Sequence, residues 1–324
     1  MSLRLSDQWV WDCWFAVDGE EIHAFYLQAD RSLGEPDRRH WNASIGHAVS
    51  RDLRDWTVLP TAFGPSSEPD RPDSYTTWTG SIVRREGLWH LFYTGTNRGE
   101  NGLIQRVCLA TSTDLHHWQK QPGPEIAPLD PHWYEQLDLG RWHDQSWRDP
   151  WVMRDTDDGR YHMFVTCRIN SGPDDGRGAI GHAVSTDLVD WAVQPPVLAP
   201  GWYGEMEVPQ VFEIGGRHYL ICSVSTHYHS HRRRAEPGVR PRTGTIYFVG
   251  ESMTGPWHAP DDPFLIGDET GSLYAGRVVQ TAALGHSLVA FRNVDDSGAF
   301  IGELSDPMPI EALPDGRLRI GSGA

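Results

Sequence analysis

The sequence has no apolar run long enough to cross a membrane, and its N-terminal residues contain no apolar core of signal-peptide length. Basic residues are few: 28 Lys and Arg face 44 Asp and Glu, which gives a formal net charge of −16. Nucleic acids and anionic membrane surfaces repel a chain of this charge. We therefore expect a soluble, cytoplasmic protein whose partners include neither nucleic acid nor a membrane.

Cysteine is also scarce, and the four cysteines are spread singly along the chain, at Cys13, Cys108, Cys167 and Cys222. None belongs to a Cys-x-x-Cys pair, so their spacing indicates neither a zinc site nor a disulfide framework. We expect four buried thiols, no metal and no cofactor. Amphipathic helix periodicity is scarce as well, while Gly and Pro interrupt short apolar runs throughout, which favours an all-β protein.

The chain repeats two short elements. The first is an apolar strand after a turn, and it occurs at residues 21–27, 87–93, 159–165, 216–221 and, more weakly, 285–291. The second reads Ser-x-Asp-Leu-x-x-Trp and occurs at residues 50–56, 112–118 and 185–191, with looser copies further on. Its spacing of 62, 73 and 67 residues, counted between Ala48, Ala110, Ala183 and Gly250, fits a four-stranded blade with long loops.

Five such repeats predict a five-bladed β-propeller of four-stranded antiparallel blades around a central axial pocket. We expect one domain over residues 1–324, with blades at roughly 9–60, 75–122, 145–198, 205–265 and 272–322. The Ser-x-Asp-Leu-x-x-Trp element would form the turn from the third to the fourth strand. Its Asp would cap that turn and its Trp would pack between blades.

Three carboxylates recur at one phase of this repeat. Asp12, Asp149 and Glu207 each lie 13 to 15 residues before the centre of the apolar strand, where the first strand of a blade lines the axis. Trp78 and Tyr274 hold the comparable places in the second and fifth blades. Carboxylates are costly to bury, so three at one phase indicate a shared pocket rather than three separate turn caps. Glycoside cleavage uses such a set, because one carboxyl group protonates the leaving oxygen while another attacks the sugar or activates water.

The same residues carry a resemblance to a known group of enzymes. The motifs are Val10-Trp11-Asp12-Cys13-Trp14, Trp78-Thr79-Gly80-Ser81, Arg148-Asp149-Pro150, Glu205-Met206-Glu207-Val208-Pro209 and Leu273-Tyr274-Ala275. In this order they resemble motifs of glycoside hydrolase families 68 and 32, the levansucrase and invertase group. The resemblance spans the whole predicted propeller.

The resemblance implies a role for each motif residue. Asp12 would be the nucleophile, Asp149 the stabiliser of the transition state and Glu207 the general acid and base. Six further residues would bind the sugar: Trp11, Trp78, Ser81, Arg148, Glu205 and Tyr274. Two departures in the motifs bear on substrate and acceptor choice: Val208 replaces the usual Arg or Cys, and Phe15 replaces a common Pro. We also expect the C-terminal β-sandwich of family 32 to be missing, which is a third departure.

We therefore expect a retaining hydrolase or fructosyltransferase that acts on terminal β-fructofuranosides of the sucrose or fructo-oligosaccharide type. One alternative is an inverting arabinofuranosidase or xylosidase-like hydrolase on the same architecture, and another is a non-catalytic sugar-binding propeller. Loops should contribute contacts at the rim of the pocket, with Trp41, Asn42, His143 and the His- and Arg-rich run 227–234 as candidates.

Overall fold

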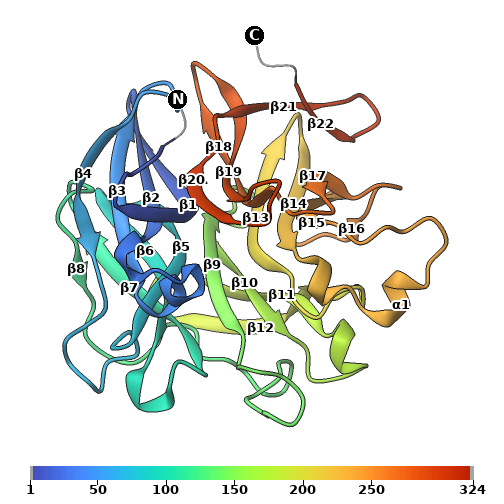
Figure 1. The fold of residues 1–324 in the computed structure, drawn as a ribbon, viewed down its shortest axis with the longest axis horizontal. Helices are drawn as coiled ribbons and strands as arrows, with labels where there is room; N and C mark the ends of the chain where they lie inside the picture. The colour runs from blue at the N-terminus through green and yellow to red at the C-terminus, as the bar shows by residue number, and fades with distance from the viewer. Residues whose placement is uncertain (1–2, 322–324) are drawn as a thin grey trace. The chain divides into compact units, whose positions relative to one another are not determined.

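The computed structural model describes residues 3–321. The outermost residues of the expected domain 1–324, including the last residue of the expected fifth blade, lie outside this range. Strands dominate the chain and form five sheets, one for each repeat (Figure 1). The fold class is the expected five-bladed β-propeller.

The first three sheets each have four strands, in sequence order across the sheet. The first sheet contains β1 (Gln8–Asp18), β2 (Glu21–Asp30), β3 (Ser44–Ser50) and β4 (Thr57–Phe63). The second contains β5 (Thr76–Arg85), β6 (Leu88–Thr96), β7 (Gln105–Ser112) and β8 (Gln119–Lys120). The third contains β9 (Trp147–Arg154), β10 (Tyr161–Arg168), β11 (Gly178–Ser185) and β12 (Trp191–Leu198).

The last two sheets each have a fifth strand, which differs from the expected four. The fourth contains β13 (Glu207–Ile214), β14 (Arg217–Val224), β15 (Thr243–Gly250) and β16 (Trp257–His258), and β17 (Phe264–Asp268) also pairs with β15. The fifth contains β18 (Leu273–Thr281), β19 (Gly285–Val294), β21 (Met308–Ala312) and β22 (Leu318–Ile320), and β20 (Phe300–Leu304) also pairs with β19.

The helices are short and lie in loops. They are the 3-10 turns η1 (Arg31–Leu33), η2 (Pro36–Trp41), η3 (Arg98–Glu100), η4 (Asp174–Gly176) and η5 (Thr226–Tyr228), and the α-helix α1 (His231–Arg234). Within residues 3–321, none is long and apolar enough to cross a membrane. All four cysteines are buried and free, as expected.

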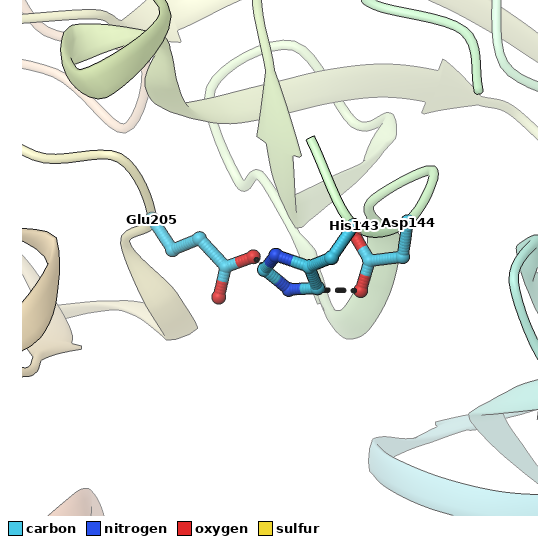
Figure 2. A group of neighbouring side chains, drawn as sticks. All are labelled: His143, Asp144 and Glu205. Atoms are coloured by element: carbon cyan, nitrogen blue, oxygen red, sulfur yellow. Dashed lines mark ion pairs between the residues drawn. The ribbon is translucent and has the colours of Figure 1, made fainter. Parts of the chain in front are cut away.

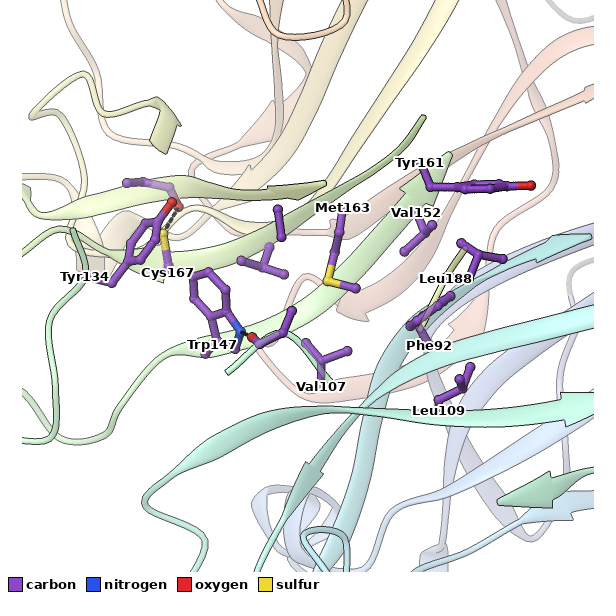
Figure 3. Packing of buried hydrophobic residues seen from close by; sticks show 14 residues of the cluster. Phe92, Val107, Leu109, Tyr134, Trp147, Val152, Tyr161, Met163, Cys167 and Leu188 are labelled. Atoms are coloured by element: carbon purple, nitrogen blue, oxygen red, sulfur yellow. Dashed lines mark hydrogen bonds between the residues drawn. The ribbon is translucent and has the colours of Figure 1, made fainter. Parts of the chain in front are cut away.

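The chain divides into two compact units. The first comprises Met1–Ala62, Gln210–Ser223 and Arg242–Ala324 as far as they are described, and the second comprises Phe63–Pro209 and Val224–Pro241. The core of the second unit joins its two sheets: Phe92 of β6 and Met163 of β10 are fully buried in one cluster (Figure 3). In the first unit, Tyr219 of β14 and Leu288 of β19 share another buried cluster.

The Ser-x-Asp-Leu-x-x-Trp element forms the turn between third and fourth strands, as predicted. In the second sheet, Oδ1 of Asp114 accepts backbone N–H groups of His116 and His117, both at 2.8 Å. Asp52 and Asp187 accept equivalent pairs of N–H groups in the first and third sheets. The predicted packing between blades is confirmed for Trp191, whose ring meets Phe92 of the neighbouring sheet edge-to-face at 5.6 Å.

A β-bulge recurs in the first strands of the sheets. In β1, β5, β9 and β18 the pairing register with the next strand shifts once. Left-handed backbone occurs at Asp12 (φ 33°), Asp149 (φ 57°), Val208 (φ 55°) and Ala275 (φ 51°). Bulges bend a strand and redirect its side chains, and they are common beside active sites. The repeated phase seen in the sequence therefore corresponds to a repeated distortion of the backbone.

A buried histidine pair occurs in the third sheet. Nδ1 of His162 lies 3.0 Å from Nε2 of His182, and their rings stack at 5.1 Å. Burial, reinforced by the neighbouring His162, lowers the pKa of His182 to about 3. The His182 imidazole is therefore neutral in the folded protein at neutral pH.

We expect this pair to make the protein sensitive to acid. In the unfolded chain His182 has the ordinary His pKa of ~6.5, while in the folded protein its pKa is about 3. Between these two pH values only the unfolded chain binds a proton at this residue. Stability should therefore fall by ~1.4 kcal/mol per pH unit over this window, or ~2 kcal/mol between pH 7.5 and 5. Urea unfolding of wild type and His182→Gln at both pH values measures this. An equal loss in the two proteins would contradict the assignment.

Candidate active site

Arg148, the second residue of β9, is the centre of a cluster of acidic side chains. Its Nη2 donates to Oε2 of Glu205 at 2.7 Å and to Oε1 of Glu207 at 2.8 Å. Asp149 lies 3.6 Å and Asp144 3.9 Å from other guanidinium nitrogens. Burial lowers the pKa of Arg148, but the four carboxylates outweigh it and raise that pKa well above its ordinary value. One buried cation thus holds four acids together.

Asp149 is buried at the bulge of β9, and hydrogen bonds to its backbone and side chain hold it in place. Its Oδ2 accepts the Thr166 hydroxyl at 2.8 Å and the Val208 N–H at 3.1 Å, and its own N–H donates to Thr94 Oγ1 at 2.8 Å. Burial raises the pKa of Asp149, against the opposing effect of Arg148. The left-handed conformation of Val208, unusual for a β-branched residue, directs its N–H to this carboxylate.

Glu205 and Glu207 differ in exposure. The Glu205 side chain is 2% exposed, while that of Glu207, the first residue of β13, is 24% exposed. The second donor to Glu205 is Trp142, whose Nε1 lies 2.9 Å from Oε1. Glu207 is thus the carboxylate of this pair that a ligand can reach, while Glu205 is enclosed.

His143, Asp144 and Glu205 lie close enough together to be considered as a metal site (Figure 2). Nε2 of His143 is 3.6 Å from Asp144 Oδ2 and 3.5 Å from Glu205 Oε1. However, all four carboxylate oxygens already accept hydrogen bonds, from Ser146 and Gln105 on Asp144 and from Trp142 and Arg148 on Glu205. The group is better suited to a hydrogen-bonded network than to a cation, and the expectation of no metal stays a prediction.

In the first unit, Asp12 occupies the bulge of β1 and is half-buried beside the buried Trp11. Arg39, at the end of the loop after β2, is buried with its guanidinium over the Phe300 ring at 3.9 Å and near the Trp11 ring at 5.6 Å. Burial lowers the pKa of Arg39, while Asp37 and then Asp12 raise it. Asp12 is therefore in the field of a cation that is fixed by aromatic rings.

The other predicted sugar-binding residues have different surroundings. Trp78 is half-buried at the bulge of β5, and Tyr274 is half-buried in β18 with its ring edge-to-face to Phe291 at 6.0 Å. Ser81 is fully buried, and its Oγ accepts the N–H of Val152 at 2.9 Å. Its hydroxyl links β5 to β9 and does not contact the Arg148 cluster, so sugar binding by Ser81 stays a prediction.

The run 227–234 is partly exposed, with His231 at 98% exposure, and is tied to neighbouring segments by hydrogen bonds. The Tyr228 carbonyl accepts the N–H of Gly204 at 2.7 Å, and Ser230 N–H donates to the Trp202 carbonyl at 2.9 Å. Its histidines diverge: His231 lies on Asp175 at 2.7 Å, while His229 is buried against the Tyr203 ring. The loop thus braces the segment that leads into Glu205.

Several contributors to the site were not predicted. Thr94 lies in β6, Thr166 lies in β10, and Trp142 and Asp144 lie in the loop before β9. The repeat gives no signal for these residues, because it marks positions in the first strands only.

A known protein family matches most of the chain. The model of the glycosyl hydrolases family 32 N-terminal domain matches residues 15–301. The chain therefore belongs to glycosyl hydrolase family 32, as the sequence motifs indicated.

Individual relatives agree with this family. The chain is 32% identical over 241 residues to the sucrose-6-phosphate hydrolase of Escherichia coli, a match that covers 70% of this chain and 44% of that protein. The chain thus matches less than half the length of that relative. Two solved structures share the fold: the inulosucrase of Halalkalicoccus jeotgali bound to kestose (22% identity, TM-score 0.76, 98% and 87% of the chains covered) and the levansucrase of Bacillus subtilis (15%, 0.76, 98% and 86%).

Proposed function

We propose that this protein is a retaining glycoside hydrolase that acts on terminal β-fructofuranosides of the sucrose or fructo-oligosaccharide type, with transfer to a sugar acceptor as a second outcome. The observation that carries the proposal is the Arg148 cluster, in which a reachable Glu207 and an enclosed Asp149 are ordered by one guanidinium. Membership of family 32 supports the reaction class, and the name of the E. coli relative supports a sucrose-type substrate.

In the proposed reaction, Asp12 attacks the anomeric carbon while Glu207 gives a proton to the departing oxygen. The carbon–oxygen bond to the leaving sugar breaks and an ester forms at Asp12. Glu207, now a carboxylate, then removes a proton from water or from an acceptor sugar, which displaces Asp12 at the same carbon. Two displacements on opposite faces retain the configuration.

Asp149 and Arg148 have supporting roles in this reaction. The Thr166 hydroxyl and the Val208 N–H donate to the Asp149 carboxylate, and the N–H of Asp149 itself is bound to Thr94. Such a fixed acceptor can bind ring hydroxyls whose hydrogen bonds strengthen as positive charge develops on the sugar. Arg148 helps to keep the acids together, because its positive charge offsets part of their mutual repulsion. Sugar contacts by Trp11, Trp78, Glu205 and Tyr274, and location in the cytoplasm, belong to the same proposal.

Product configuration tests the proposal and separates the alternatives. Hydrolysis of sucrose, inulin-type and levan-type oligosaccharides, followed from the first minutes by NMR, should release β-fructofuranose with retained configuration. Asp12→Asn should lower kcat at least ~10³-fold, because no ester can form. An inverted product would indicate the arabinofuranosidase-like mechanism, and sugar binding without cleavage would indicate a binding module.

A further inference from the structure

We propose that Trp142 is a positioning residue for Glu205, and through Glu205 for the pair of Arg148 and Glu207. The inference rests on the proposed function. It assigns a role to a loop tryptophan outside every repeated motif of the chain. Four observations carry it: the donor on Glu205, the stacking of the indole, the fit of the indole against Gly204, and the sharing of one Arg148 nitrogen.

The indole N–H restrains a carboxylate that would otherwise rotate. Trp142 Nε1 binds Oε1 of Glu205 at 2.9 Å and Arg148 Nη2 binds Oε2 at 2.7 Å, so each oxygen has its own donor. The Glu205 side chain is only 2% exposed, so water reaches it poorly. Nε2 of His143 is also near Oε1, at 3.5 Å, but the indole N–H is the closer group at 2.9 Å. The two donors together fix the plane of the carboxylate.

The indole is itself held by a buried ion network. The Arg168 guanidinium carbon lies 3.6 Å from the centre of the Trp142 ring, and Arg168 is 1% exposed. Arg168 Nε donates to Glu135 at 2.9 Å, and Arg177 pairs with the other oxygen of Glu135. A cation stacked on an indole in a desolvated site is a favourable contact. Trp142 is thus anchored independently of Glu205.

The backbone before Glu205 is shaped to the same indole. A Cβ added at Gly204 would lie 2.6 Å from Cη2 of Trp142, so a side chain there would force the indole to move. Arg168 Nη1 also donates to the Gly204 carbonyl at 2.6 Å, and the Tyr228 ring lies 5.7 Å from the indole. The indole and the segment that carries Glu205 therefore form one packed unit.

The consequence concerns Arg148. Its Nη2 donates to both Glu205 and Glu207, at 2.7 and 2.8 Å. Arg148 Nη1 already donates to Gln105 and Ser146, so Nη2 is the nitrogen that Glu205 and Glu207 share. A Glu205 carboxylate released from the indole would be free to rotate, and its hydrogen bond to Nη2 would lose its fixed direction. The indole N–H thus keeps Glu205 on one hydrogen of Nη2 and leaves the other to the proposed acid.

The test is a double-mutant cycle between Trp142→Phe and Glu205→Gln. Phe keeps an aromatic ring beside Arg168 and removes the N–H donor together with the five-membered ring that carries it. We expect kcat/KM on sucrose to fall about ten- to a hundredfold in Trp142→Phe, as for a lost hydrogen bond to a charged group. The double variant should be no worse than Glu205→Gln alone, because Trp142 acts through Glu205. Losses that multiply would overturn the proposal.

The matched control is Trp118→Phe. Trp118 Nε1 donates to the Leu115 carbonyl at 3.1 Å, in the turn between β7 and β8, so the same atom is removed from a contact outside the cluster. We expect unchanged kcat/KM in this variant. A loss equal to that of Trp142→Phe would show that any missing indole donor has the effect, and would overturn the proposal.

An NMR measurement that does not depend on enzymatic activity separates this inference from the proposed function. The chain has fifteen tryptophans, and labelling them with ¹⁵N gives one indole N–H signal each. The signal that is missing in Trp142→Phe should move in Glu205→Gln. If wild type cleaves no fructoside but that signal moves, the proposed function fails and the positioning role stands. If Trp142→Phe does not fold, the Glu205→Gln spectrum decides alone: a spectrum in which no indole signal moves overturns the role.

Discussion

Replacing Glu207 by Gln is expected to lower kcat on sucrose by about 10²- to 10⁴-fold, the usual contribution of a general acid. Gln cannot supply the proton, but its carbonyl oxygen can still accept from Arg148 Nη2, which lies 2.8 Å from Oε1 of Glu207. The fold and the cluster should therefore persist. Steady-state kinetics with sucrose measures the loss, and circular dichroism checks the fold.

The size of this loss should depend on the leaving group. A sugar alkoxide needs a proton to depart, whereas fluoride or nitrophenolate does not. On fructosyl fluoride the loss in ester formation should therefore be small. Glu213→Gln is the matched control, because Glu213 lies in the same strand, β13, and is exposed. Wild-type turnover of sucrose by Glu207→Gln would show that another group is the acid.

Replacing Lys120 by Met is expected to destabilise the protein by about 3–5 kcal/mol, the usual cost of breaking a buried ion pair from one side. Lys120 is the only lysine of the chain, and it pairs with Asp73, which is fully buried. Oδ2 of Asp73 also accepts the Tyr93 hydroxyl at 2.9 Å, while Oδ1 has no hydrogen-bond partner in the described part of the chain. Met preserves the packing of the side-chain stem but leaves the carboxylate dependent on the more distant Arg71, whose Nε lies 3.9 Å from Oδ1.

Urea unfolding at pH 7.5 measures this change. The double variant Lys120→Met with Asp73→Asn should recover much of the lost stability, because it removes the stranded charge. Gln119→Met, an exposed neighbour in the same strand, should shift the unfolding free energy by less than ~0.5 kcal/mol. If Lys120→Met alone lowered the unfolding free energy by less than ~0.5 kcal/mol, water or a rearrangement would be stabilising the Asp73 carboxylate in place of Lys120.

The fold was predictable because two different sequence elements, an apolar strand and a Ser-x-Asp-Leu-x-x-Trp turn, recur along the chain with similar spacing. The Asp residues at positions 52, 114 and 187 cap their turns as their spacing from Ser and Trp indicated. The phase of the first strands also identified Asp12 and Asp149, both of which lie at bulges. In β13 the left-handed residue is Val208, one position after Glu207. Residue counting cannot resolve this difference, because the lengths of the turns vary.

The rest of the site could not be read from periodicity. Trp142 and His143 come from a loop of the second unit, where side-chain direction follows from local turns and not from a strand period. Ser81 shows the reverse case: its motif resembles a sugar-contacting segment, yet its hydroxyl accepts a backbone N–H of the adjacent sheet. A motif identifies the backbone position, while the packing around it decides which groups remain free.

The recurrent bulge also bears on how this chain could diversify. Thr79 and Ala275 lie where their own strands shift register, as Asp12 and Asp149 do in theirs. The backbone at each of these places is already bent by the sheet that carries it. Both Thr79 and Ala275 are buried, so a codon change that exchanges one small side chain for another alters the chemical group there without requiring the backbone to rearrange.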